Sequence, residues 1–332
     1  MWRYAPALPL LDGEDPITLG EGATPLVELP KLAREVGVGR LFVKDEGKNP
    51  TASFKARGLA AAVTRARARG VPGLVVPTAG NAGAALAAYG AAAGVAVRVY
   101  APITTPAPIL ATIRALGADL VTVEGHIGDA GRLAVDFARE SGFFNVATLR
   151  EPYRVEGNKT LGIELAEQLG WALPDVIVYP TGGGEGVVGI WKAALEMREW
   201  GWIDPSVPLP KLVVAQAAGC APLVRAWKAA AGEALPWENP QTSAAGLRVP
   251  APLGDRLVLK ALRESGGIAA AVDEELIAAA TKWMATRSGI DACPEGGCAL
   301  AVLVDLVREG AIGANACVVV FNTGSGASYR SA

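Results

Sequence analysis

Short apolar runs with strand character alternate with helical segments along most of this 332-residue chain. The runs are four to eight residues long and rich in Val, Leu and Ile, as expected for strands that are covered on both faces. Helices between successive strands are the usual connection between parallel strands. The alternation therefore predicts an α/β fold in which parallel sheets are flanked by helices.

The expected elements divide into two groups. The length suits about two domains of roughly 150 residues each, and residues 55–146 look like a small α/β domain inserted into a larger, discontinuous one formed by 1–54 and 147–332. This division predicts a cleft between the domains. We expect strands at 73–77, 95–100, 118–123, 175–179, 212–216 and 317–321. We expect helices at 55–69, 82–93, 107–116, 129–141, 187–200, 274–288 and 297–308.

Composition disfavours several classes of protein. Hydrophobic residues make up 51% of the chain, enough for a sizeable core, and the net charge of −2 gives no attraction to nucleic acid or an anionic membrane. The most apolar stretch, 84–100, reads better as a buried helix and strand than as a membrane span. The first residues lack the apolar core of a signal peptide. Four irregularly spaced cysteines fit no metal site or disulfide framework. We expect a cytoplasmic protein.

Lys55 stands at the expected start of a helix, in the run NPTASFKARG at 49–58. The positive end of a helix dipole, or an apolar pocket, would lower the pKa of its ammonium group and leave some neutral amine. A neutral amine can form a Schiff base with a carbonyl. On position alone, a surface lysine on a first helical turn is the simpler interpretation.

A glycine-rich loop, PTGGGEGV at 180–187, follows another expected strand. Its backbone N–H groups and the following helix terminus favour an anion such as phosphate. The carboxylate of Glu185 should then point away from that anion. The spacing of Gly184, Gly186 and Gly189 also matches the dinucleotide fingerprint. That match is weak, because the next expected strand does not end in an acidic residue.

Two further loops also follow expected strands, where ligands bind in such folds. PTAGNAG at 77–83 offers Thr78, Asn81 and helix-start amides to a carboxylate. FNTGSG at 321–326 offers hydroxyls that can hydrogen-bond a ring nitrogen. Residues 295–298, EGGC, could line the same cleft, although a purely structural helix cap is favoured. His126 is the only histidine, and we expect it in an exposed loop.

Taken together and in this order, these loops resemble those of the fold-type-II pyridoxal-phosphate enzymes, the tryptophan-synthase-β-like family. The resemblance covers nearly the whole chain and is greatest to the threonine synthases within that family. It implies that pyridoxal 5′-phosphate lies in the cleft between two domains. The matching segments are GEGATPLV at 20–27, EGKNPTASFK at 46–55, TAGNAG at 78–83, EGNKT at 156–160, the glycine-rich loop and TGSG at 323–326.

The resemblance also implies roles for individual residues. Lys55 would be the catalytic residue and form the Schiff base with the cofactor, and Asn81 would hydrogen-bond its ring hydroxyl. Thr323, with Ser325 as the alternative, would meet the ring nitrogen. No metal is implied. The cofactor phosphate would be held by the amides of Gly182, Gly183, Gly184, Gly186 and Val187. The substrate would be bound by Ser53, Thr78, Ala79, Asn81, Ala82 and Arg154, with Arg154 the candidate for its phosphate.

The implied reaction converts O-phospho-L-homoserine and water to L-threonine and phosphate, and the family expectation is a homodimer. Ala52 stands where many relatives have glycine and Ala56 where many have aspartate, and Lys48 replaces a residue that is commonly apolar. Residues 148–154 lack a serine that some threonine synthases place near the substrate phosphate. Three alternatives stay open. They are a threonine or serine ammonia-lyase on the same scaffold, a non-catalytic ligand-binding homologue, and an oxidoreductase that binds NAD(P).

Overall fold

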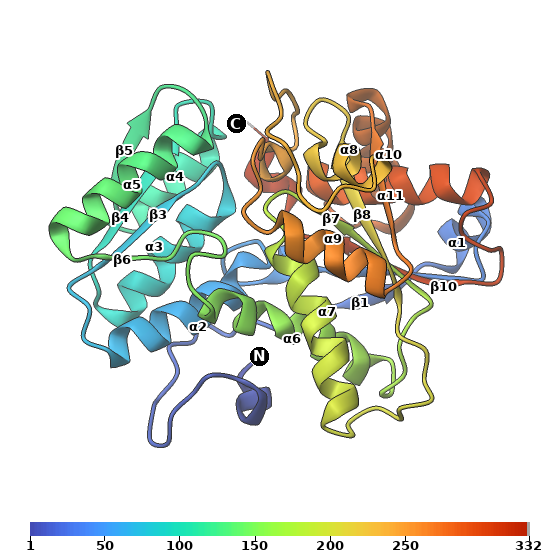
Figure 1. Cartoon of the computed structure of the whole chain (residues 1–332), viewed down its shortest axis with the longest axis horizontal. Coiled ribbons are helices and arrows are strands. Elements are labelled where there is room, and N and C mark those ends of the chain that lie inside the picture. Colours follow the sequence, from blue (N-terminus) through green and yellow to red (C-terminus); the bar gives the residue numbers. More distant parts are fainter. Residues whose placement is uncertain (331–332) are drawn as a thin grey trace.

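The computed structural model describes residues 1–330, and within them two α/β units lie next to each other (Figure 1). The larger unit is built on a six-stranded sheet in the order β1-β2-β10-β7-β8-β9. Its strands are parallel except for the edge strand β1, which pairs antiparallel with β2. The sheet comprises β1 (Leu26–Glu28), β2 (Arg40–Asp45), β7 (Val176–Pro180), β8 (Lys211–Ala217), β9 (Ile268–Val272) and β10 (Cys317–Asn322).

The smaller unit contains a four-stranded parallel sheet in the order β5-β4-β3-β6, again within the described residues. All of its strands come from the segment that the sequence assigns to an inserted domain. The predicted α/β fold with parallel sheets is confirmed, whereas the domain boundaries at 54/55 and 146/147 stay a prediction. The strands are β3 (Leu74–Pro77), β4 (Val97–Pro102), β5 (Asp119–Val123) and β6 (Phe144–Asn145).

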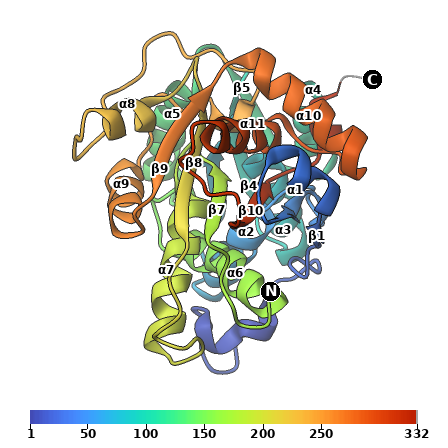
Figure 2. The same cartoon turned by 90° about the vertical axis from the view of Figure 1, so that its right-hand side faces the viewer.

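Helices cover both faces of the large sheet, which is why its strands are apolar throughout (Figure 2). Along β7, Val176 and Val178 pack on one side, while Ile177 and Tyr179 pack on the other. The first face is covered by α1 (Pro30–Val36), α10 (Glu274–Ser288) and α11 (Pro294–Arg308). The second face is covered by α6 (Tyr153–Gln168), α7 (Glu185–Glu199), α8 (Pro222–Lys228) and α9 (Asp255–Glu264).

The small sheet is covered in the same way. Val76 and Val99 face one group of helices, and Val75 and Tyr100 face α5 (Ile127–Ser141). The group on the first face comprises α2 (Lys55–Ala68), α3 (Asn81–Ala93) and α4 (Ala107–Ala115). Short 3₁₀ segments complete the structure at η1 (Trp2–Ala7), η2 (Glu46–Lys48), η3 (Ala245–Leu247) and η4 (Gly326–Tyr329).

Helices α2 and α6 join the two units at very close range. A Cβ atom on Gly157 would lie 2.3 Å from the carbonyl oxygen of Arg57, and one on Gly58 would lie 2.9 Å from that of Arg154. The two backbones therefore touch, and a larger side chain at either glycine would push the helices apart. This contact fixes the start of α2, and with it Lys55.

A buried ionic network strengthens the same joint. The Arg57 guanidinium donates to Glu46 at 2.7 Å and to Glu164 at 2.8 Å, and the Lys44 ammonium donates to Glu164 at 2.6 Å. All four side chains are fully buried. The network ties α2 to the end of β2 and to α6.

Over residues 1–330, the structure contains no helix that is both long and apolar enough to cross a membrane. In the same range, no three His, Cys, Asp or Glu side chains come together in a way that could hold a metal ion.

Candidate active site

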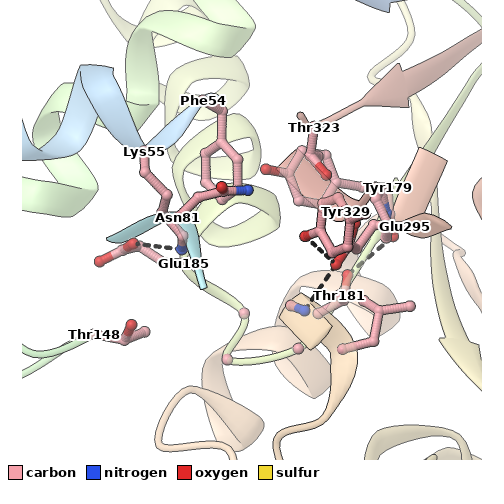
Figure 3. A pocket seen from close by; sticks show the side chains of 17 residues that line it. Phe54, Lys55, Asn81, Thr148, Tyr179, Thr181, Glu185, Glu295, Thr323 and Tyr329 are labelled. Carbon is pink, nitrogen blue, oxygen red and sulfur yellow. Dashed lines mark hydrogen bonds and ion pairs between the residues drawn. The ribbon is translucent and has the colours of Figure 1, made fainter. Parts of the chain in front are cut away.

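A pocket lies where strands of both sheets end (Figure 3). The loop after β7 supplies its glycines, the loop after β10 supplies Thr323, and Asn81 and Lys55 reach it from the first residues of α3 and α2. The pocket thus brings together side chains from chain segments that are more than 250 residues apart. Its lining comprises Phe54, Lys55, Asn81, Thr148, Tyr179, Pro180, Thr181, Gly182, Gly183, Gly184, Glu185, Gly186, Gly246, Leu247, Glu295, Thr323 and Tyr329.

The glycine-rich loop forms a cradle that larger residues would fill. A Cβ atom on Gly182 would lie 2.2 Å from the carbonyl oxygen of Gly246, and one on Gly186 would lie 2.0 Å from the Tyr179 hydroxyl. Gly184 has a φ of 92°, a left-handed conformation that favours glycine. Helix α7 begins at this loop. Its first backbone N–H groups have no acceptors within the helix, so they are available to an anion.

Lys55 is held in this pocket by a carboxylate and an aromatic ring. Its Nζ lies 3.4 Å from Glu185 Oε2 and 4.3 Å from the centre of the Phe54 ring. Burial lowers the pKa of the Lys55 ammonium to about 8; Glu185 opposes this shift, and the positive charge of Arg154 adds to it. A substantial fraction of the amine is therefore neutral near physiological pH.

Arg154 lies behind Lys55, and its guanidinium is bonded within the protein. Its Nη2 donates to Glu185 Oε2 at 2.7 Å and its Nη1 donates to the carbonyl oxygen of Val146 at 2.6 Å. The side chain is only 1% exposed and is not part of the pocket lining. Glu185 turns its carboxylate toward both cations. A role for Arg154 in substrate binding would require its release from Glu185.

The Thr323 hydroxyl lies next to a neutral thiol. Its Oγ1 lies 3.8 Å from Cys293 Sγ, whose pKa burial raises well above the usual range, so the thiol stays neutral. The side chain of Asn322 accepts from the Cys293 amide at 3.1 Å and donates to Asp45 at 2.8 Å. Ser325 instead caps η4, where its hydroxyl accepts the amide of Ala327 at 3.2 Å.

The loop after β3 is closed by hydrogen bonds of its own. The Thr78 hydroxyl accepts from the amides of Gly80 and Gly83 at 3.0 and 3.2 Å. Asn81, which follows, lines the pocket, whereas Thr78, Ala79 and Ala82 are not among the lining residues. Ser53 is 1% exposed, and its hydroxyl finds no hydrogen-bond partner among residues 1–330.

Ten of the seventeen lining residues were not predicted from the sequence as site residues, among them Glu295, Tyr329 and Tyr179. Glu295 Oε1 accepts from the Tyr329 hydroxyl and from the Gly246 amide, both at 2.7 Å, while its Oε2 is buried without a partner in the described part of the chain. The EGGC segment at 295–298 could have indicated a pocket role for Glu295, but its pattern favours a structural helix cap. The sequence gives no indication of a site role for the two tyrosines. Tyr329 follows the last motif, and Tyr179 lies within an apolar strand.

This fold and pocket are those of a pyridoxal-phosphate-dependent enzyme. A model of the family described as pyridoxal-phosphate dependent enzymes matches residues 17–324. The chain belongs to this family, and its cofactor is pyridoxal 5′-phosphate. The residues present suit that group, since a partly buried amine of lowered pKa and a glycine cradle at a helix N-terminus open into one pocket.

Among proteins of known function, the chain is similar to threonine synthases over almost all of its length. The threonine synthase of Methanosarcina acetivorans is 39% identical, with 98% of this chain and 79% of the relative covered. That of Methanocaldococcus jannaschii is 37% identical, with 98% and 80% covered. In structure, the chain is similar to a fungal L-serine ammonia-lyase from Rhizomucor miehei, with a TM-score of 0.79 at 23% identity and with 92% and 94% of the two chains covered.

Proposed function

We propose that the chain is a threonine synthase, which converts O-phospho-L-homoserine and water to L-threonine and phosphate. Near-full-length similarity to threonine synthases at up to 39% identity carries this proposal. The substrate is a small amino acid. We further propose that the enzyme acts as a homodimer in the cytoplasm, as its biosynthetic relatives lead us to expect.

The residues of the pocket have the chemistry that this reaction needs. We propose that the amides of Gly182, Gly183, Gly184, Gly186 and Val187 bind the cofactor phosphate. We propose that Asn81 hydrogen-bonds the ring hydroxyl and that the Thr323 hydroxyl bonds the ring nitrogen without protonating it. Bound pyridoxal phosphate would supply an electron-withdrawing ring that disperses the negative charge left by the lost proton.

Lys55 is the proposed proton carrier. Its Nζ, once free, removes the proton from the α carbon of the substrate, because its lowered pKa leaves part of the amine unprotonated at neutral pH. A second proton then leaves the β carbon as phosphate leaves the γ carbon, and the γ carbon takes up a proton. Water then adds its hydroxyl group at the β carbon, and Lys55 Nζ can return the first proton to the α carbon. Ser53 and the loop from Thr78 to Ala82 are proposed to receive the substrate, with the amides of that loop toward its carboxylate.

Lys55→Ala tests this function directly. We expect the variant to lose both the visible absorbance of the bound cofactor and threonine formation, the latter by about 10²–10⁴-fold or more. The measurement is phosphate release together with threonine formation from phosphohomoserine. Lys228→Ala, which removes an exposed lysine from α8, is the matched control and should behave as the wild type. Wild-type activity of the Lys55→Ala variant would contradict the assignment.

One observation favours a second candidate, a threonine or serine ammonia-lyase. Such a reaction needs no second anion site, and among the described residues Lys55 is the one Lys or Arg that lines the pocket. Formation of 2-oxobutyrate from L-threonine, without phosphate release from phosphohomoserine, would establish this alternative. If the purified chain showed no cofactor absorbance after addition of pyridoxal phosphate, a non-catalytic homologue would be indicated instead.

A further inference from the structure

Glu185 occupies an unexpected place for an acidic residue. It is the first residue of α7, directly after the glycines proposed to bind the cofactor phosphate, yet its side chain is only 1% exposed. A buried carboxylate is costly unless positive charges or hydrogen-bond donors compensate it. Compensating charges or hydrogen-bond donors are therefore expected next to the Glu185 carboxylate.

The compensation comes from two cations on different helices. Glu185 Oε2 lies 2.7 Å from Arg154 Nη2 on α6 and 3.4 Å from Lys55 Nζ on α2. Arg154 is anchored in turn by its 2.6 Å bond to the Val146 carbonyl oxygen. Figure 3 shows the Glu185 carboxylate directed at the Lys55 amine. The second oxygen, Oε1, is buried without a partner within residues 1–330.

We propose that Glu185 is a positioning residue for Lys55, which holds the free lysine amine in place and stabilises its ammonium form after it has taken a proton from the substrate. Arg154 serves as the fixed anchor of the Glu185 carboxylate rather than as the ligand of the substrate phosphate. The inference rests on the proposed role of Lys55 in catalysis.

The proton transfer between the substrate and Lys55 balances without a further reactant. The C–H bond at the α carbon breaks, its electron pair stays with the substrate–cofactor system, and a new N–H bond forms on Lys55 Nζ. Lys55 gains a positive charge at a point that faces Glu185, so the two opposite charges attract, and the carboxylate is almost fully buried. The proton later returns from the same nitrogen.

Other charged groups modify this interaction. Glu295 on α11 favours the charged form of Lys55, whereas Arg154 disfavours it. Glu151, before α6, lies close to Arg154 and Glu185, and burial raises its pKa to about 7. Glu151 therefore titrates in the working range and contributes to any pH profile of the site.

Selective labelling of Lys55 measures the proposed interaction without catalysis. The full chain, freed of cofactor, is treated with trinitrobenzenesulfonate over a pH series, and the labelled Lys55 peptide is quantified by mass spectrometry. The midpoint of the curve of labelling rate against pH reports the pKa of Lys55. In Glu185→Gln, we expect this midpoint to fall by about one pH unit, which makes labelling about fivefold faster at pH 7. Glu185→Asp keeps the charge and should restore most of the wild-type midpoint. Glu199→Gln, an exposed change on the same helix, should leave it unchanged.

A double variant covers the case in which Glu185→Gln fails to fold. Glu185→Gln with Arg154→Met removes both buried charges, so Arg154 is not left as a buried cation without its carboxylate. Because the two charges act on Lys55 in opposite directions, we expect a smaller shift of the midpoint than in Glu185→Gln. An unchanged labelling midpoint in Glu185→Gln would overturn the proposal. If Glu185→Gln does not fold, a downward shift of a full pH unit in the double variant would overturn it instead.

The loaded enzyme supplies an independent readout. In Glu185→Gln, the acid limb of the kcat profile should move to lower pH, because a base with a lower pKa is already neutral there, while the maximum rate falls. If threonine forms but the labelling midpoint does not move, the inference about Glu185 fails and the proposed function stands. If the midpoint moves as expected but the wild type makes no threonine, the proposed function fails instead.

Discussion

At Gly182, one methyl group decides whether the loop after β7 can keep its course. A Cβ atom there would lie 2.2 Å from the Gly246 carbonyl oxygen and 3.0 Å from a methyl carbon of Val249. The nearer neighbour is backbone, so it cannot move aside as a flexible side chain would. The loop itself would have to shift, and with it the amides proposed to bind the cofactor phosphate.

We therefore expect Gly182→Ala to bind pyridoxal phosphate at least about tenfold more weakly than the wild type, a loss of about 1.4 kcal/mol, and to be less stable by about 1–3 kcal/mol through overpacking. A spectroscopic titration with the cofactor and a thermal unfolding curve measure the two effects. Gly232→Ala is the control, because a Cβ atom there meets nothing within 4 Å. Unchanged cofactor affinity in Gly182→Ala would show that this loop does not hold the cofactor as proposed.

The sequence could locate the pocket residues that follow strands. Ligands bind past the carboxyl ends of parallel strands. Asn81 follows β3 of the small sheet, the glycine-rich loop and Thr323 follow β7 and β10 of the large sheet, and all three line one pocket. It could not foresee the partner of Arg154. That residue pairs with Glu185, 31 positions away, and such a pairing depends on how α6 packs against α7. The roles of these residues in binding and catalysis stay predictions.

At the scale of elements, α6 shows where sequence patterns lose their value. Arg154, Asn158, Lys159 and Glu164 are all buried on this helix, so it lacks the apolar stripe by which an amphipathic helix is recognised. The sequence does not reveal their partners, which lie on α2 and β2 for Glu164 and on α7 for Arg154 and Lys159. The predictions from the sequence did not include α6, nor did they include the short elements β6 and α1. They also omitted α9, although the regular apolar stripe of this helix is visible in the sequence.

The ionic network between α2, α6 and β2 should dominate the response to acid. Salt bridges with Arg57 lower the pKa of Glu164 and of Glu46 against the opposing effect of burial. Carboxylates with a lowered pKa in the folded state contribute stability above their unfolded pKa of about 4.3, and this contribution is lost as the pH falls below it. The free energy of unfolding should therefore decline steeply below about pH 4.

Arg57→Leu tests this network. The variant leaves Glu46 and Glu164 buried without their main cation, so we expect the free energy of unfolding at pH 7 to fall by about 3–5 kcal/mol. Its loss of stability on acidification should also be weaker, because protonation then relieves the unpaired carboxylates. Urea unfolding at pH 7 and pH 4 measures both effects. Arg40→Ala, which breaks an exposed pair with Glu28, should change little. Equal losses in both variants would speak against the network.

At the scale of the whole molecule, the two units are joined in two different ways. On one side, α2 and α6 touch backbone to backbone at Gly58 and Gly157. On another, Arg248 donates from Nη2 to the carbonyl oxygen and the hydroxyl of Thr104, both at 3.3 Å and in an exposed position. Helix α4 also packs near η4, which includes the pocket residue Tyr329. A tight joint opposite weaker contacts is the arrangement expected of units that close over a substrate.

Closure predicts a role for Arg248 in holding the closed form. In the wild-type holoenzyme, a phosphonate analogue of phosphohomoserine should slow hydrogen exchange in residues 103–106. In Arg248→Ala, the slowing should be smaller and KM several-fold higher, while the melting temperature changes little because the lost contacts are exposed. Arg256→Ala, which removes an exposed arginine of the same unit, should match the wild type. Exchange that is identical with and without the analogue in the wild type would rule out closure, because exclusion of water requires that these exposed contacts tighten when substrate is bound.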